Sequence, residues 1–216
     1  MLPNCTKINF DTWSRTAIFR HFIDDVRCVI SVTADIDVTN FVHWNKNRGL
    51  RFFPSFLYVV SKAVNKRSEF RFGYDENGEV VVWDSVNPSY ADFRGDDGGF
   101  ASLVSNYSPD FEAFYRTVTQ DMDRYKDKHG FEVEFDRRNV FDVSCLPWLH
   151  YKSVDMHVFD NGTWLAPVIT WGKYEEKSGR ILMPLSMQIH HAVADGFHIA
   201  RFFADVEDEV AKLIAL

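Results

Sequence analysis

The stretch "QIHHAVADGFHIARFF", residues 188–203, decides how the rest of the chain is interpreted, because three histidines and one aspartate lie there between two apolar patterns. Before it, Ile181, Met183, Leu185, Met187 and Ile189 alternate with more polar residues, which predicts a half-buried strand. After it, apolar side chains recur at helical spacing and predict a closing helix: Phe197, Ile199, Phe202, Phe203, Val206, Val210, Leu213 and Ile214. We therefore expect a strand, a polar turn and a helix.

The first half of the chain alternates helical and extended patterns. Helices are predicted over residues 13–22, behind an Asp11-Thr12 cap, over residues 39–47, and after Pro54. A strand is predicted over residues 27–38. Asn77-Gly78 lies between two β-rich runs and predicts a hairpin, because both residues tolerate positive φ.

The second half adds one long helix and a series of strands. A strand over residues 99–107 is followed by a helix capped by Ser108-Pro109 and ended by Gly130. Four strand-like runs follow, the last two joined by a turn at Ser178-Gly179: residues 139–148, 152–159, 164–174 and 179–191. We predict an α/β two-layer sandwich in which helices pack on a mixed, largely antiparallel sheet.

Composition excludes several classes of protein. With 216 residues, 46% of them hydrophobic, residues 1–216 are expected to form a single domain. The net charge of −7 and the lack of a basic run argue against nucleic-acid binding. The absence of a secretory leader or an apolar run of about 20 residues argues against secretion and membrane insertion. Three cysteines without a C-x-x-C pair favour a reducing cytoplasm.

His191 is the best candidate for a catalytic base. If the strand continues, its alternation places His191 on the apolar side, where desolvation keeps an imidazole neutral and able to accept a proton. An ordinary core histidine bonded to the backbone is the alternative. Asp195-Gly196 predicts a tight turn in which the carboxylate caps the last helix or binds a cation supplied from elsewhere.

A metal site is the second reading of the same residues. His191, Asp195 and His198 would share a face if the segment were helical. Asp195-Gly196 should break such a helix, and neither an HExxH motif nor a cysteine ligand accompanies it. No metal is therefore expected.

The motif "HHAVADG" resembles the H-H-x-x-x-D-G signature of CoA-dependent acyltransferases, in the form found in type A chloramphenicol acetyltransferases. The similarity covers nearly the whole chain, because further segments follow that family's pattern in order: "DTWSR", "FPSFLYVV", "EFRFGYDENGEVVVWDSVNPSY", "VSCLPW", "APVITWGKY" and "LMPLSMQIHH". The set is much more specific than the motif alone.

The resemblance implies acetyl transfer from acetyl-CoA to a hydroxyl of chloramphenicol, with His191 as general base. It implies that Ser144 stabilises the tetrahedral oxyanion, that Thr170 holds a water nearby, and that Asp195 pairs with Arg15 in a structural role. It also places Lys173, Tyr174 and Trp148 along the coenzyme A channel. The acceptor pocket that it implies contains Phe22, Cys28, Phe100, Val154 and Met156. The family is a homotrimer with His191 at a subunit boundary.

Some positions depart from the family pattern. Ala194 stands where relatives commonly have cysteine, Val154 where several have phenylalanine, and Phe22 where some have tyrosine. These departures concern acceptor affinity more than the reaction. Two other functions are considered: a lipoyl-dependent core acyltransferase, disfavoured because no lipoyl domain or linker precedes the motif, and a catalytically silent trimeric protein that sequesters a hydrophobic ligand.

Overall fold

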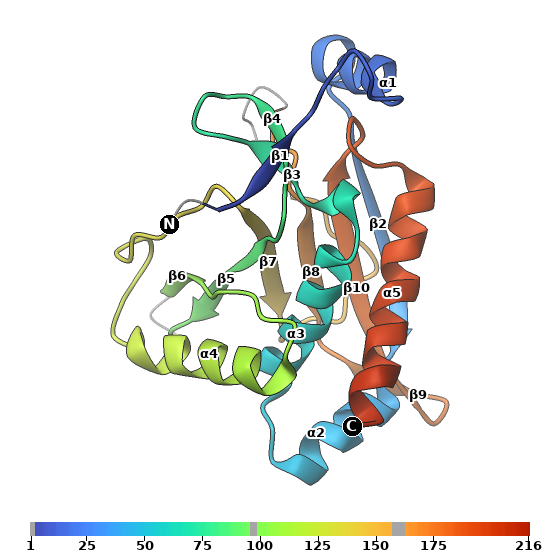
Figure 1. Ribbon diagram of the computed structural model, residues 1–216. Helices are drawn as coiled ribbons and strands as arrows, with labels where there is room; N and C mark the ends of the chain where they lie inside the picture. Colours follow the sequence, from blue (N-terminus) through green and yellow to red (C-terminus); the bar gives the residue numbers. More distant parts are fainter. Residues whose placement is uncertain (1–2, 96–98, 157–162) are drawn as a thin grey trace.

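A mixed β-sheet forms the centre of the computed structural model, which describes residues 3–95, 99–156 and 163–216 (Figure 1). Within these residues the main sheet has seven strands: β2 (Val29–Asp37), β10 (Arg180–His190), β8 (Val168–Gly172), β7 (Val140–Leu146), β5 (Asn87–Phe93) and β6 (Phe100–Val104) in spatial order, with β9 (Glu175–Lys177) beside β10. Strand β7 runs parallel to β5 and β8, and the other pairs are antiparallel. The predicted α/β class, with a mixed and largely antiparallel sheet, is confirmed.

Helices cover one face of this sheet. Helices α3 and α5 lie side by side across it, and α4 packs against α3 (Figure 1). Met183, Leu185, Met187 and Ile189 are almost fully buried beneath them, as the alternation on β10 predicts. The helices are α1 (Thr16–Arg20), the π-helical turn η1 (His21–Asp25), α2 (Thr39–Arg48), α3 (Phe52–Asn65), the 3₁₀ turn η2 (Ser68–Phe70), α4 (Phe111–Arg124) and α5 (Gly196–Ile214).

The opposite face of the sheet carries a polar row. Ser144 on β7 lies opposite Thr170 on β8, Thr170 opposite Ser186 on β10, and Ser186 opposite Thr33 on β2. Directly opposed residues share a face, so four strands contribute one hydroxyl each to what we call the hydroxyl row. The Thr33 and Ser186 hydroxyls are 2.7 Å apart. This face is therefore polar where the helix side is apolar.

The predicted hairpin at Asn77-Gly78 belongs to a small second sheet. Strands β3 (Phe72–Tyr74), β4 (Val80–Trp83) and β1 (Cys5–Lys7) form it, in the order β1-β4-β3. The hairpin forms as predicted, but only Gly78 of the pair has positive φ, at 76°. The Asp75 carboxylate accepts hydrogen bonds from the backbone N–H groups of Asn77 and Glu79, at 2.9 Å each.

Several predicted boundaries were wrong for local reasons. Asp110, rather than Ser108, caps α4, because its carboxylate accepts from the Ala113 N–H at 2.7 Å. That helix ends at Arg124, before Gly130. The first helix begins at Thr16, not at residue 13. Residues 152–156 form no strand, and the rest of that predicted run, residues 157–159, lies outside the described residues.

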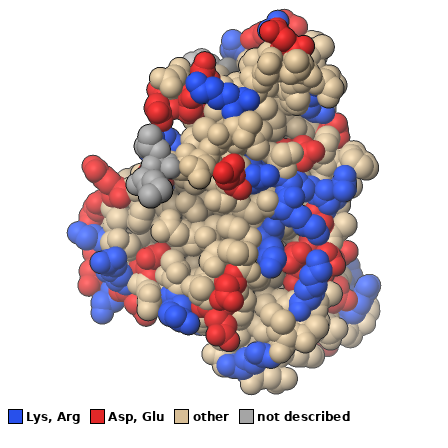
Figure 2. Space-filling view, in the orientation of Figure 1, with Lys and Arg blue, Asp and Glu red and all other residues tan. Residues whose placement is uncertain are grey.

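Charged side chains of both signs are interspersed on the face drawn in Figure 2, without a continuous basic track over its described part. None of the helices within residues 3–95, 99–156 and 163–216 is long and apolar enough to cross a bilayer.

Candidate active site

His191 lies in the turn between β10 and α5, and its position is fixed by the backbone. Strand β10 ends at His190, and the His191 N–H donates to the Cys28 carbonyl at 2.8 Å, just before β2 begins. His190, not His191, is the almost fully buried histidine, at 1% exposure. The expectation that strand alternation places His191 on the apolar side was therefore wrong, because the strand does not reach it.

The orientation of the His191 ring follows from two contacts. Its Nδ1 lies 3.0 Å from the Ala194 carbonyl oxygen. A carbonyl can only accept, so Nδ1 donates, and in the neutral ring Nε2 then carries a free lone pair. The Phe22 ring stacks on the imidazole, with centroids 4.0 Å apart and planes at 15°. The ring is thus held with its basic nitrogen directed away from the turn backbone.

Arg15 ties this turn to the N-terminal segment. Its guanidinium donates from Nη2 to the His191 carbonyl at 3.0 Å and from Nε to the Ala192 carbonyl at 2.9 Å. Nη1 lies 3.2 Å from Oδ2 of Asp195, so the ion pair implied by the resemblance is present. One side chain therefore holds both the backbone of His191 and the first residue of the α5 cap.

Asp195 has two structural tasks. It caps α5, because its carboxylate accepts from the Phe197 N–H at 3.1 Å. Partial burial by itself raises the pKa of this carboxyl, but the Arg15 hydrogen bond and the nearby His198 outweigh it, and the net pKa is lowered. The side chain is 35% exposed, compared with 15% for Arg15, so this ion pair is only partly buried.

Within the described parts of the chain, no three His, Cys, Asp or Glu side chains are grouped to hold a metal ion.

Ser144 and Thr170 form the middle of the hydroxyl row. Thr170 is buried and Ser144 half-buried, and they face each other across the parallel pair of β7 and β8. Tyr151 lies over them: its hydroxyl donates to the Thr170 carbonyl at 2.7 Å and is 3.2 Å from the Ser186 hydroxyl. The two hydroxyl residues implied by the resemblance are thus adjacent.

His191 and the Ser144–Thr170 pair are not brought together within one chain. Thr170 is opposite Ser186, and His191 follows Ser186 by five residues along the direction of β10. At about 3.3 Å per residue this separation is roughly 17 Å. A single copy of the chain therefore cannot apply both groups to one reacting carbonyl.

The acceptor-pocket residues divide in the same way. Phe22 and Cys28 contact His191, and the Val154 and Met156 backbone binds β2 and β10, through Ser31 at 3.2 Å and Gln188 at 2.8 Å respectively. Phe100 lies on edge strand β6, four strands away from β10, which at about 4.8 Å per strand is roughly 19 Å. It is 40% exposed and contacts the Phe131 ring.

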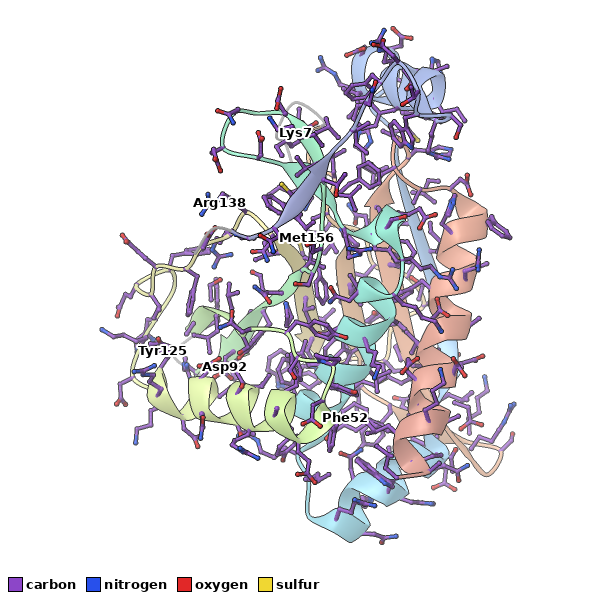
Figure 3. All side chains as sticks on the ribbon, in the orientation of Figure 1. Lys7, Phe52, Asp92, Tyr125, Arg138 and Met156 are labelled. Carbon is purple, nitrogen blue, oxygen red and sulfur yellow. The ribbon has the colours of Figure 1, made fainter. Side chains whose placement is uncertain are left out.

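The residues implied for coenzyme A gather at the end of β8 away from His191. Lys173 and Tyr174 follow β8 directly, and Lys173 N–H donates to the Leu149 carbonyl at 2.9 Å, next to Trp148. Phe52, labelled in Figure 3, lies at the start of α3. Its ring centroid is 5.4 Å from that of Tyr174, and the Trp148 and Phe93 ring centroids are 4.8 Å apart. Sequence reasoning missed both phenylalanines, because neither belongs to a motif.

Gly172 explains how this end is built. A Cβ on Gly172 would stand 2.6 Å from the Leu149 carbonyl oxygen and 2.9 Å from both the Pro184 and Tyr151 rings. Only glycine lets the Trp148–Tyr151 segment lie this close to β8. The glycine in "VITWGKY" could have signalled this close approach.

Comparisons with known proteins identify the family. The family model described as chloramphenicol acetyltransferase matches residues 3–207. The chain is 36% identical to a chloramphenicol acetyltransferase of Clostridium perfringens over 202 residues, covering 93% of this chain and 92% of that protein. The chain belongs to the chloramphenicol acetyltransferase family. A second chloramphenicol acetyltransferase, from Proteus mirabilis, is also 36% identical, with 93% and 92% coverage.

The fold comparison places the same family first and extends to others. A solved chloramphenicol acetyltransferase superposes with a TM-score of 0.82 at 25% identity, covering 96% of this chain and all of that one. A probable dihydrolipoamide acetyltransferase from Listeria monocytogenes superposes with a TM-score of 0.64 at 16% identity, covering 96% and 94%. That second likeness shows a shared fold only.

Proposed function

We propose that this chain is a chloramphenicol O-acetyltransferase that moves an acetyl group from acetyl-CoA directly to a hydroxyl of chloramphenicol. Membership of the family supports the substrates. The observation that carries the mechanism is the Nδ1 hydrogen bond of His191 to the Ala194 carbonyl, at 3.0 Å. It leaves Nε2 as the atom that can take a proton, and a neutral imidazole nitrogen with a free lone pair suits a general base.

The proposed reaction has two proton transfers and no covalent intermediate on the protein. Nε2 of His191 removes the proton of the acceptor hydroxyl while the hydroxyl oxygen bonds to the thioester carbonyl carbon. Negative charge then develops on the former carbonyl oxygen, where the Ser144 hydroxyl donates a hydrogen bond and Thr170 holds a water. The carbon–sulfur bond breaks, and the departing sulfur of CoA receives the proton from Nε2.

The proposal assigns the remaining groups to binding and support. Arg15 and Asp195 hold the His191 turn in place. Phe22, Cys28, Phe100, Val154 and Met156 line the acceptor pocket, and Trp148, Lys173 and Tyr174 contact coenzyme A. Val154 and Phe22, the positions that depart from relatives, are proposed to tune acceptor affinity.

We propose that the working unit is a homotrimer in which His191 of one copy faces Ser144 and Thr170 of the next. The roughly 17 Å separation along β10 within one chain supports this arrangement, because another copy can supply the base that the Ser144 side lacks. The polar, helix-free face of the sheet offers a surface for such contacts. The same division accounts for Phe100, which lies far from the other acceptor-pocket residues of its own chain.

The activity is tested by following thiol release from acetyl-CoA with chloramphenicol as acceptor, and with dihydrolipoamide as the competing acceptor. Thiol release that requires chloramphenicol supports the proposal. Release with dihydrolipoamide alone would favour the lipoyl-dependent alternative. Tight binding of chloramphenicol without release would favour the silent binding protein.

The shared site is tested by mixing two defective variants, His191→Ala and Ser144→Ala, and refolding them together at equal amounts. If His191 and Ser144 of different copies meet, about one site in four in a random trimer carries both intact residues, and activity rises above that of either variant refolded alone. If both residues act within one chain, the mixture has only the averaged activity of the two variants.

We further propose that the protein acts in the cytoplasm and without a metal. The three cysteines Cys5, Cys28 and Cys145 are free, which suits a reducing compartment. Full activity after dialysis against a chelator is the expected result, and loss of activity that added zinc restores would overturn the metal-free mechanism.

A further inference from the structure

His198, on the first turn of α5, lies between two carboxylates. Its Nδ1 is 2.9 Å from Oδ1 of Asp195 and its Nε2 is 3.4 Å from Oε1 of Glu69. Its side chain is 17% exposed, so the contacts are largely sheltered from water. Nδ1 also accepts from the Asp195 backbone N–H at 3.2 Å, which completes the α5 capping box, so His198 contacts both the backbone and the carboxylate of Asp195.

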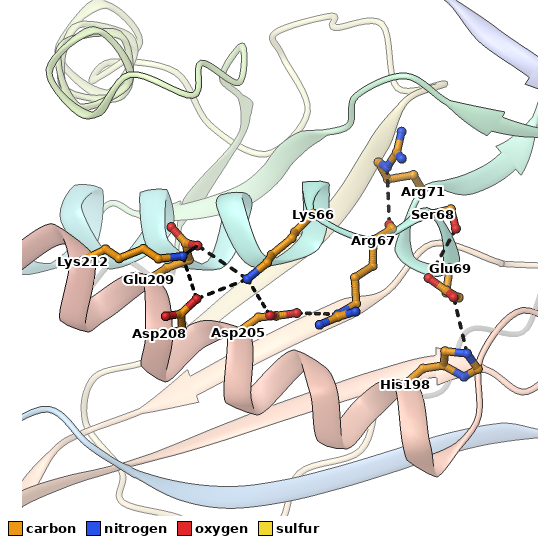
Figure 4. A network of polar contacts seen from close by, with 10 residues as sticks. All are labelled: Lys66, Arg67, Ser68, Glu69, Arg71, His198, Asp205, Asp208, Glu209 and Lys212. Carbon is orange, nitrogen blue, oxygen red and sulfur yellow. Dashed lines mark hydrogen bonds and ion pairs between the residues drawn. The ribbon is translucent and has the colours of Figure 1, made fainter.

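Glu69 comes from a different part of the fold. It lies in η2, after α3, and Figure 4 shows it reaching His198 across the gap between α3 and α5. Arg67, the residue before this turn, forms an ion pair with the buried Asp205 of α5. Arg71 Nε also donates to the Arg67 carbonyl, at 3.4 Å. Glu69 is therefore presented to His198 from an anchored turn.

The contacts of His198 continue to the proposed base. The Asp195 carboxylate uses Oδ1 toward His198 and Oδ2 toward Arg15, at 3.2 Å. Arg15 in turn holds the carbonyls of His191 and Ala192. A continuous chain of polar contacts thus joins Glu69, His198, Asp195 and Arg15 to the His191 backbone. Oδ1 also accepts from the Phe197 N–H at 3.1 Å, so His198 adds a second contact on this side of the carboxylate.

We propose that His198, held by Glu69, is a positioning residue for the acetyl transfer: it fixes Asp195 beside Arg15 and so keeps the His191 turn in its productive position. His198 touches neither substrate in this scheme and acts only through Asp195. These polar contacts border a surface hollow of about 500 Å³, which is lined partly by Trp13, Arg15, Glu69 and His198. Water in that hollow screens the ion pairs, so the effect of each residue is moderate.

The test measures kcat and KM for both substrates in His198→Gln and Glu69→Gln, with melting temperatures. Glutamine at this helix position can still accept from the Asp195 N–H, so His198→Gln keeps the cap but loses the ring nitrogen that faces Glu69. Glu69→Gln leaves the cap untouched. His43→Gln, an exposed histidine on α2, is the matched control. We expect a fall in kcat of about 5- to 30-fold in both variants, with KM changed less than about twofold and the control unaffected.

The decisive experiment combines His198→Gln with Asp195→Asn in one protein. If His198 acts through Asp195, the histidine change causes no further fall in kcat in that background. An equal fall in both backgrounds, or a lowered melting temperature with unchanged kcat, would overturn the inference. The inference rests on the proposed function: a wild-type protein that releases no thiol would overturn both, whereas an active wild type with unaffected variants would overturn the inference alone.

Discussion

At the level of single side chains, the orientation of His191 comes from its own turn and not from the strand before it. The Ala194 carbonyl selects the tautomer, and the stacked Phe22 ring limits rotation of the imidazole. His190, its neighbour, accepts from the Ala192 N–H at 3.2 Å from within the core. Two adjacent histidines are thus held by different backbone groups, and His191 is the one proposed as the base.

His191→Ala is expected to abolish acetyl transfer while leaving the melting temperature nearly unchanged, because it removes the proposed base from a half-buried turn with little core volume. Thiol release and thermal unfolding measure the two properties. His190→Ala should instead lower the melting temperature, since it empties a core position. If His191→Ala kept its activity while a folded His190→Ala lost it, the base would be His190 and not His191.

Ser144→Ala is expected to lower kcat by about 10²- to 10³-fold and to change KM little, because the hydroxyl is proposed to act on charge that exists only in the transition state. Steady-state kinetics for each substrate measure both constants. Ser153→Ala, on the exposed segment after Tyr151, is a control of the same type. An effect confined to KM would make Ser144 a binding residue.

At the level of elements, periodic sequence patterns predicted individual strands and helices but not the pairing of segments that are far apart in the sequence. The alternation on β10 and the helical spacing on α5 were read correctly, because one face of each is buried. The small sheet needed β1 beside β4, a pairing between segments about 75 residues apart that no local pattern encodes. The residue that caps α4 was predicted wrongly for a simpler reason. Ser108 and Asp110 are both good capping residues, and only the geometry selects Asp110.

The site shows the same limit. The resemblance supplied Arg15 and Asp195 as a pair, and the structure adds the two carbonyls that Arg15 also holds. No pattern pointed to Glu69, because its partner His198 lies more than 120 residues away in the sequence. Polar contacts of this kind depend on where two helices pack, which composition and periodicity do not determine.

The junction of Arg15 with the start of α5 predicts a dependence on acid. The folded pKa of Asp195 is lowered, so the ionised carboxyl stabilises the fold above its unfolded pKa of about 4, and this stabilisation is lost as the pH falls through the folded value. The wild-type melting temperature should therefore fall below about pH 4 more steeply than that of Asp195→Asn. Parallel curves for the two proteins would show that the carboxyl does not contribute.

A double-mutant cycle on Arg15→Gln and Asp195→Asn isolates the ion pair at neutral pH. Because Asp195 is about one third exposed, we expect a coupling of about 0.5 to 2 kcal/mol, less than the about 3 to 5 kcal/mol typical of breaking a fully buried pair. Melting temperature and rate are both measured, with a chelator control. Strictly additive effects would show that the Arg15–Asp195 ion pair contributes to neither stability nor rate. Loss of activity with chelator would show that a bound metal is required instead.

At the level of the whole molecule, the two ends of the sheet differ in function. His191 and Phe22 lie at the end where β2 begins, near α1 in Figure 1, and Lys173 and Tyr174 lie at the other end, near β9. The Ser144–Thr170 pair lies between them. The chain thus presents the proposed base at one end and the proposed coenzyme A site at the other, and the proposed trimer joins the two ends of different copies.

The hydroxyl row has a consequence for how activity appears during synthesis. Two of its hydroxyls, those of Thr33 and Ser186, are hydrogen-bonded to each other, and the Ser186 hydroxyl also contacts that of Tyr151 in the same chain, so these groups need no second copy to be satisfied. In the proposed trimer, each copy folds in a first-order step, whereas catalysis waits for encounters between copies. In a dilution series of refolding protein, the recovery of circular dichroism should keep one rate at every concentration, while the delay before acetylation begins should lengthen as the protein becomes more dilute. A cell that starts to make this protein would accordingly gain its activity in proportion to a higher power of the amount made, with little at first and a steep rise later.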